Sequence, residues 1–383
     1  VLAEQFDLSR NHLDVLLVAL APTVDSSFRN LFREAGDSRR IDFPTTDLVE
    51  RLFGTSRQNQ LTAFGLVDDD SPLRRHDLLR VEPVDEDSRS RRALRPSDRL
   101  HSYLKGTGGF DTELADAVSI TEPQTSLDDL RLDDHLQQRV EVLRNQRDDC
   151  LVNPNAEPSV HYFHGREGSE KCRAVDALVD GRLLRGDLDA ILAADQLDRF
   201  HREALLQDCP VHLTNVSEAT RDPGPDPDDD SPSPTADRPT LEEVVGELAD
   251  LQRDLFLTGT DGWTPTSNHD HARFDLLTFT EPDVDLRREI WQTYADEIAE
   301  DVDLDAIAST FTLTQGQIDD AVETARTLTD DSRGDKLSRE ALVDGCTSQT
   351  AKGLEKLATK VEPDADWDDL VLRSDVEREL WEI

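Results

Sequence analysis

The stretch that most constrains the fold of this chain covers residues 160–172, VHYFHGREGSEKC. Residues 160–163 have the apolar character of a buried strand, two glycines follow within the next five positions, and a lysine precedes a helical pattern. A strand, a glycine-rich turn and a helix in this order follow the outline of the phosphate-binding pattern G-x-x-x-x-G-K-[ST]. The pattern predicts an α/β protein with a parallel sheet whose ligand edge lies at the carboxyl ends of the strands.

Two residues of this phosphate-binding pattern are missing. Glu170 stands where the last glycine belongs, and a thiol replaces the hydroxyl group that would hold magnesium. A carboxylate repels a triphosphate, whereas glycine lets backbone N–H groups approach the phosphates closely. We therefore expect weak binding of ATP at most and no bound Mg²⁺. The candidate nucleotide-binding residues are Gly165, Gly168, Ser169, Lys171 and Cys172.

Charge is the second strong constraint. The 383 residues carry 83 acidic and 42 basic side chains, a formal net charge of -41, and six of the basic residues are lysines. Self-repulsion of this size weakens a compact state in dilute buffer, but at about 1 M salt the Debye length is only ~3 Å. We interpret the composition as an adaptation to multimolar intracellular salt. The alternative, an ordinary acidic or partly disordered protein, is disfavoured by the regular apolar periodicity.

Several kinds of site and location are disfavoured. No stretch approaches 18 apolar residues and no signal peptide opens the sequence, so we expect a cytoplasmic protein without a membrane span. The four cysteines show no paired spacing, which argues against disulfides or a zinc ribbon. The histidine pairs His161/His164 and His269/His271 lack a third ligand at a recognisable spacing, so no metal site is predicted.

Composition divides the chain into five segments. Residues 1–105 have helical patterns, including a helix over 11–22 that we expect to stop at Pro22, and a helix that opens with Thr45 as its cap and closes at Gly54. Residues 106–152 are predicted to form a helical connector.

The α/β segment is predicted at 153–282. Its strands are expected at 160–163, 209–214 and 255–260, its helices at 171–184 and 241–252, and a proline-rich disordered insertion at 221–240. Residues 283–350 follow as a helical segment, and residues 351–383 are the last.

The order of these patterns resembles a two-module AAA-family ATPase of a halophilic archaeon. The resemblance rests on the loop remnant, LFLTGT at 255–260, TLTQGQIDDAV at 312–322 and KVEPDADWDDLVL at 360–372. In that group a winged-helix-like N-terminal domain and a degenerate first AAA module, with a P-loop NTPase-like sheet and a helical lid, precede a catalytic second module. The resemblance implies that 283–350 is the lid, that 351–383 enters a second module beyond Ile383, and that the protein forms a homo-oligomeric ring.

The resemblance also implies roles for individual positions. The Walker B position, which should carry two carboxylates that position magnesium and activate water, falls on Leu213, Thr214 and Asn215. A threonine at 258 or 260 stands near the sensor position, and an arginine at 287 or 288 begins the lid without being assigned as an arginine finger. No catalytic residue is predicted. We expect that this module does not hydrolyse ATP. The resemblance leaves open whether the protein as a whole is an enzyme.

The leading function hypothesis is a regulatory, assembly and partner-recognition region of an AAA ATPase that remodels proteins. Related ATPases also occur beside contractile injection machines. One alternative is a winged-helix regulator that binds nucleic acid through the arginines between Arg74 and Arg99, although pairing of these arginines with neighbouring carboxylates is favoured over DNA binding. The other alternative is a stand-alone scaffold without ATPase activity.

Overall fold

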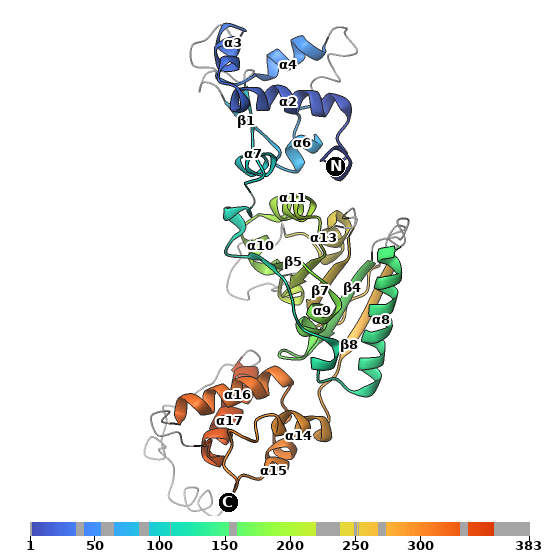
Figure 1. Cartoon of the computed structure of the whole chain (residues 1–383), viewed down its shortest axis with the longest axis vertical. Coiled ribbons are helices and arrows are strands. Elements are labelled where there is room, and N and C mark those ends of the chain that lie inside the picture. Colours follow the sequence, from blue (N-terminus) through green and yellow to red (C-terminus); the bar gives the residue numbers. More distant parts are fainter. Residues whose placement is uncertain are drawn as a thin grey trace, which may run out of the picture. The chain divides into compact units, whose positions relative to one another are not determined.

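The chain forms two compact units, residues 1–280 and residues 281–383, whose elements are drawn in Figure 1. The predicted insertion at 221–240 and the last segment at 351–383 lie largely outside the described residues. The computed structural model describes residues 2–35, 42–54, 65–83, 92–107, 109–152, 159–219, 238–248, 251, 253–266, 273–329 and 336–355.

The N-terminal part of the first unit is a set of helices with one antiparallel hairpin. In the hairpin Leu79 pairs with Pro96, and Pro83 pairs with Arg92. Apolar side chains from α2, α4, α6 and the hairpin share one buried core. The elements are α1 (Leu2–Gln5), α2 (Arg10–Val24), α3 (Ser27–Ala35), α4 (Thr46–Phe53), α6 (Pro72–Arg75), β1 (Leu79–Pro83), β2 (Arg92–Pro96) and α7 (Asp98–Leu104).

Two helix ends in this part test the sequence predictions. Helix α4 lies between Thr45 and Gly54 as predicted, although the Thr45 side chain makes no capping hydrogen bond. Helix α2 does not stop at Pro22, and that prediction was wrong by two residues. A proline removes one N–H donor, but the next turn still closes, because Asp25 N–H donates to the Ala21 carbonyl at 3.0 Å.

A six-stranded sheet with the order β3-β5-β6-β7-β4-β8 forms the centre of the α/β module. All neighbouring strands are parallel except β3, which runs antiparallel to β5. This mainly parallel sheet confirms the predicted α/β fold class. The strands are β3 (Val118–Thr121), β4 (Ser159–Gly165), β5 (Leu183–Asp187), β6 (Val211–Thr214), β7 (Leu255–Gly259) and β8 (Arg273–Phe279).

Three of the six strands were not predicted from the sequence. Strand β3 lies inside the predicted helical connector and β8 follows the third predicted strand. Strand β5 lies at the end of the helix predicted for 171–184; helix α9 (Lys171–Leu178) ends earlier, and Gly181 then turns the chain with a φ of 87°. An L side chain rarely adopts that φ, so the glycine separates helix from strand.

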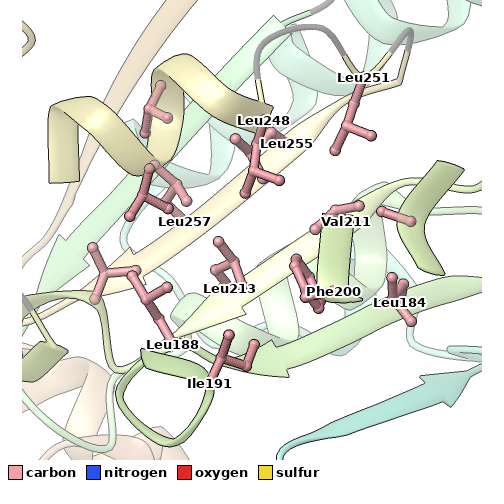
Figure 2. Packing of buried hydrophobic residues seen from close by; sticks show 14 of the residues in the cluster. Leu184, Leu188, Ile191, Phe200, Val211, Leu213, Leu248, Leu251, Leu255 and Leu257 are labelled. Carbon is pink, nitrogen blue, oxygen red and sulfur yellow. The ribbon is translucent and has the colours of Figure 1, made fainter. Parts of the chain in front are cut away.

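Helices cover both faces of the sheet. Helices α10 (Leu188–Ala193), α11 (Leu197–Gln207) and α13 (Leu241–Leu248) pack on one face, where Leu213, Leu255 and Leu257 meet Ile191, Phe200 and Leu248 (Figure 2). Helices α8 (Asp134–Val152) and α9 pack on the other face. Both faces of the sheet are therefore removed from water, as expected for a parallel sheet.

The second unit is a helical bundle. Trp291 and Ile318 are fully buried in its core. Helix α16 begins with Thr314 and Gln317 in a capping box, and Gly345 brings α17 so close that a Cβ there would lie 2.3 Å from the Ala321 carbonyl oxygen. The helices are α14 (Val284–Gln292), α15 (Leu304–Thr310), α16 (Gln315–Leu328) and α17 (Arg339–Glu355).

Candidate functional site

The loop between β4 and α9 has the shape that the sequence pattern predicts. Gly165 ends the strand at a position where a Cβ would lie 2.2 Å from the Phe279 carbonyl oxygen, so the approach of β8 requires a glycine. Gly168 has a φ of 76°, in the left-handed region that glycine adopts without strain. These two glycines bend the chain back to the first residue of α9.

The Lys171 side chain points into its own loop. Its ammonium group donates to the Gly165 carbonyl at 2.6 Å, to the Arg166 carbonyl at 2.8 Å and to the Ser169 hydroxyl at 3.1 Å. An ammonium group has three donors, and the loop offers an acceptor for each of them. Phosphate oxygens would have to replace these acceptors before Lys171 could bind a nucleotide.

Glu170 places a carboxylate at the start of α9. Its side chain is 5% exposed and pairs with Arg173 at 3.2 Å, and it makes no capping hydrogen bond to the helix. The N-terminus of a helix attracts anions, because its first N–H groups are unpaired and its dipole is positive there. A fixed carboxylate in this place competes with a phosphate group for the same favourable potential.

Cys172 lies in the first turn of α9, beside a chain of polar groups that crosses three strands. Its Sγ is 3.8 Å from Oγ1 of Thr258 in β7, and this hydroxyl is 3.0 Å from Nε2 of His212 in β6. Arg185 in β5 donates from Nε to His212 Nδ1 at 3.2 Å and pairs with Asp176. Because Nδ1 accepts, the imidazole proton lies on Nε2 and is donated to Thr258.

Burial keeps this histidine neutral. His212 is fully buried, and desolvation together with the nearby Arg185 lowers its pKa to about 3. A neutral imidazole with both nitrogens engaged is neither a free base nor a metal ligand. The polar chain therefore holds the strands and α9 together beneath the loop.

The carboxyl end of β6, where the Walker B carboxylates are expected, carries none. Leu213 is buried in the core, the Thr214 hydroxyl donates to the Gly186 carbonyl at 3.3 Å, and the Asn215 amide donates to Asp187 at 2.7 Å. Asp187 in turn accepts from the backbone N–H of Ala190 as the cap of α10. Hydroxyl and amide groups that are already bonded cannot position magnesium as a carboxylate pair would.

The residues at the predicted sensor and lid positions also form hydrogen bonds or ion pairs within the protein. Thr258 belongs to the polar chain, whereas the backbone N–H of Thr260 donates to the Ser217 hydroxyl at 2.9 Å. In the second unit Arg287 is buried and donates to the Ala308 carbonyl at 2.9 Å, and Arg288 pairs with carboxylates of its own bundle, Asp285 and Asp305. Each of these side chains or backbone groups has a structural partner.

Comparison with known families assigns the two ends of the chain. Residues 1–118 match the winged helix domain, variant, and residues 283–352 match the contractile injection system ATPase helical domain. The N-terminus is a winged helix domain. No curated protein matches the chain. The predicted winged-helix character of the N-terminus is thus confirmed, and the helical unit carries the ATPase helical domain.

Four of the six described arginines between 74 and 99 pair with carboxylates. Four pairs join arginines between 74 and 99 to acidic side chains, the last of them buried. Arg89 and Arg91 lie outside the described residues, and Arg92 is exposed at the start of β2. The pairs are Arg74–Asp69 at 2.6 Å, Arg80–Asp77 at 3.2 Å, Arg95–Glu82 at 2.8 Å and Arg99–Glu203 at 2.7 Å.

Two adjacent charged residues of α11 join the winged helix domain to the α/β module, and no sequence pattern predicted them. Glu203 is fully buried and accepts from Nε and Nη2 of Arg99 at 2.7 and 2.8 Å. Arg202 is fully buried as well and pairs with Asp77 at 2.6 Å and with Asp111. These residues are about 100 positions apart in sequence, so no local pattern could reveal the contact.

The described histidines among the remaining candidates gather into no metal centre. His161 Nδ1 lies 3.3 Å from Asp275, and His164 Nε2 lies 2.8 Å from the Thr278 hydroxyl. His269 and His271 fall outside the described residues. Across the described part of the chain no three histidine, cysteine or acidic side chains gather as metal ligands.

No helix among the described residues has both the length and the apolar character of a membrane span.

Proposed function

We propose that this chain is the regulatory and partner-recognition region of an AAA-family ATPase associated with a contractile injection system, and that its α/β module does not hydrolyse ATP. The observation that carries the proposal is the contractile injection system ATPase helical domain at 283–352, which follows a mainly parallel sheet with a phosphate-loop shape. We assign partner recognition to the winged helix domain ahead of the sheet. The remodelling activity would belong to a second module.

The residues of the loop do not fit ATP and Mg²⁺ well. Lys171 is bound to its own loop, Glu170 places a negative charge where a phosphate would lie, and the end of β6 offers no carboxylate. Magnesium prefers carboxylate and phosphate oxygens in near-octahedral geometry. We therefore infer weak ATP binding at most, no resident Mg²⁺ and no hydrolysis in this module.

The working environment is part of the proposal. We place the protein in a salt-rich cytoplasm, as a ring-forming homo-oligomer, because a net charge of -41 favours a strongly screening solvent. The cysteines Cys172, Cys209 and Cys346 are unpaired in the structure, which suits a reducing compartment.

A nucleotide titration tests the proposal for the module. We expect a fluorescent ATP analogue to bind the full chain only at millimolar concentration or not at all in about 2 M KCl. Lys171→Ala should not change this result, and neither should Lys336→Ala, which removes an equal charge from the helical unit. Micromolar binding that Lys171→Ala abolishes and Lys336→Ala retains would refute the proposed inactive site.

A restored loop is the complementary experiment. The double variant Glu170→Gly/Cys172→Ser returns the missing glycine and hydroxyl, and we expect its nucleotide affinity to exceed that of the wild type by about tenfold or more. The thermal midpoint of each variant shows whether it has folded. An unchanged affinity in a folded double variant would mean that the position of Lys171, and not its two neighbours, disables the site.

The existence of a second module is tested on the natural protein. The intact mass and the peptides that follow Ile383 should be measured in the source cell. A mass well above 43.0 kDa with a complete G-x-x-x-x-G-K-[ST] downstream supports the regulatory role. A mass near 43.0 kDa contradicts it and supports a stand-alone scaffold.

A nucleic-acid-binding regulator is the second candidate, because the N-terminal match is a winged helix domain. The paired arginines leave few free cations for phosphate contacts. A mobility-shift assay with duplex DNA separates the two roles. A shift that persists at high salt and is lost in Arg89→Ala/Arg91→Ala/Arg92→Ala would favour the regulator over the assembly role.

A further inference from the structure

A cleft of about 600 Å³ lies within the first unit, between the winged helix domain and the α/β module. Helices α1 and α6 supply one wall, and α11 and α13 supply the other. Its volume falls in the range of ligand-binding pockets. The cleft is separate from the loop at Lys171, and the function proposed above does not use it.

Carboxylates dominate the walls of the cleft. Glu4, Asp7, Asp198 and Glu247 line it, against one arginine, Arg75. The last two carboxylates are on the module side, and burial raises the pKa of each; the charge of Asp198 raises the pKa of Glu247 further. Both residues are exposed, and the nearby Arg75 lowers the pKa of each in opposition to these effects. Four carboxylates against one arginine leave a net negative charge in the cleft, which favours a second cation.

Three aromatic side chains are among the residues that line the cleft. The Phe6 ring meets the His76 ring edge to face at 5.2 Å, and His76 meets His201 in the same way at 5.1 Å. Burial and the neighbouring His76 lower the pKa of His201 to about 4, so its ring is neutral near pH 7. Neutral aromatic faces beside carboxylates suit a guanidinium group, which stacks on rings and forms two parallel hydrogen bonds to a carboxylate.

Unused hydrogen-bonding groups adjoin the cleft. Nε2 of His201 and Oε1 of Gln5 are buried and have no hydrogen-bond partner among the described residues. Buried polar atoms in folded proteins are nearly always paired, so these two require an explanation. A ligand rich in N–H donors, such as a guanidinium, would supply partners after a small side-chain adjustment.

We propose that this cleft binds an arginine side chain of a protein partner. The inference rests on the partner-recognition role proposed above and names the chemistry of the partner. Asp198, His201 and Leu205 recur at helical spacing on α11, whereas Arg202 and Glu203 of the same helix hold the winged helix domain. An arginine in the cleft contacts both domains, so its binding is coupled to their association.

The experiment measures binding of a short peptide to the full chain by calorimetry. The probe is acetyl-Gly-Arg-Arg-Gly-amide, and its partner peptide has citrulline in place of both arginines, which keeps the shape and removes the charge. We expect the arginine peptide to bind at least about tenfold more tightly than the citrulline peptide in about 0.2 M KCl. Equal affinities, or no binding of either peptide, would overturn the proposal.

Variants locate the binding site. Asp198→Asn/Glu247→Gln should weaken binding of the arginine peptide by at least about tenfold. The control Asp116→Asn/Glu141→Gln removes the same charge from exposed positions outside the cleft and should leave the affinity within about twofold of the wild type. Equal losses in both variants would show attraction to the acidic surface as a whole and overturn the site.

A third arm identifies the source of the cation. Spermidine carries several ammonium groups without a peptide, and binding as tight as that of the arginine peptide would assign the cleft to a free polyamine and overturn the protein partner. Failure of this inference is distinguishable from failure of the proposed function, because the nucleotide titration and the mass of the natural protein use neither the cleft nor the peptide. The thermal midpoint of each variant confirms that it is folded.

Discussion

At the residue scale, His212 is the clearest case in which the fold sets a side chain's charge. Its ordinary pKa is 6.5, and in the folded chain it is about 3. Below pH 6.5 the unfolded chain takes up a proton that the native state refuses, so stability is full above that pH and is lost as the pH falls. We expect the free energy of unfolding to decrease by up to about 1.4 kcal/mol per pH unit from this group.

Urea titrations between pH 7 and pH 4.5 measure this effect. The contributions of other titrating groups cancel when the wild type and a variant are compared at the same pH. His212→Gln does not titrate, so its stability deficit relative to the wild type should shrink as the pH falls. A deficit of His212→Gln that is independent of pH would contradict the buried neutral imidazole.

The hydroxyl that receives the His212 proton gives a second test. Thr258→Val keeps the shape but leaves Nε2–H of His212 buried without its acceptor, so we expect a loss of about 1–3 kcal/mol in unfolding free energy. Thr260→Val is the matched control, because the hydrogen bond at that residue uses the backbone N–H. Equal effects of the two substitutions would show that the hydroxyl of Thr258 is not needed.

Individual residues of the candidate site could be predicted from the sequence only where they belong to a short sequence motif. The spacing of Gly165, Gly168 and Lys171 located the loop, and the structure brings these residues together at the junction of β4 and α9. The acceptors that bind Lys171, and the partners of His212, depend on how strands far apart in sequence align. A linear pattern does not contain that alignment.

At the element scale, α11 is the helix that connects two domains. Glu203→Gln leaves Arg99 buried with a weakened partner, and we expect a loss of about 3–5 kcal/mol in unfolding free energy. The double variant Arg99→Met/Glu203→Leu should cost less than the sum of the single variants, because no buried charge is left unpaired. Urea titration of the wild type, Arg99→Met, Glu203→Leu and the double variant measures the coupling.

The same helix offers a control. Arg199 pairs with Glu113 at the surface, where side chains are about one third to one half exposed. Glu113→Gln should therefore cost no more than about 1 kcal/mol. Should the exposed pair prove as costly as the buried one, burial would not be what makes the junction strong.

Helices and strands could be predicted where their apolar residues recur at a regular spacing. The helices of the second unit and the strands β4, β6 and β7 have clear apolar patterns, and the structure contains all of them. Strand β3 has four residues, too few for alternation to be recognised, and it is held by pairing with β5. The sequence LLRGD of β5 follows α9 after a short turn, so its two leucines extend the apolar pattern of the helix in the sequence, although Gly181 has already ended the helix.

At the scale of the whole molecule, charge balance decides the conditions of stability. With 83 acidic and 42 basic side chains, at least 41 carboxylates have no cation to pair with, even if every basic side chain formed one ion pair. Their mutual repulsion favours the expanded chain and is screened by salt, whereas the buried pair Arg99–Glu203 and the partly buried pair Arg202–Asp77 are screened much less. The two kinds of interaction therefore respond differently to ionic strength.

We expect the thermal midpoint of the full chain to rise when KCl is increased from about 0.2 M to about 2 M, because the Debye length shortens from about 7 Å to about 2 Å. Sucrose at matched osmolality is the control, since it promotes burial without screening charge. The Glu203→Gln variant should remain less stable than the wild type by a similar margin at both salt concentrations, because its loss is at a buried pair. A midpoint that falls with KCl, or that sucrose raises equally, would contradict screening of the acidic surface as the source of stability.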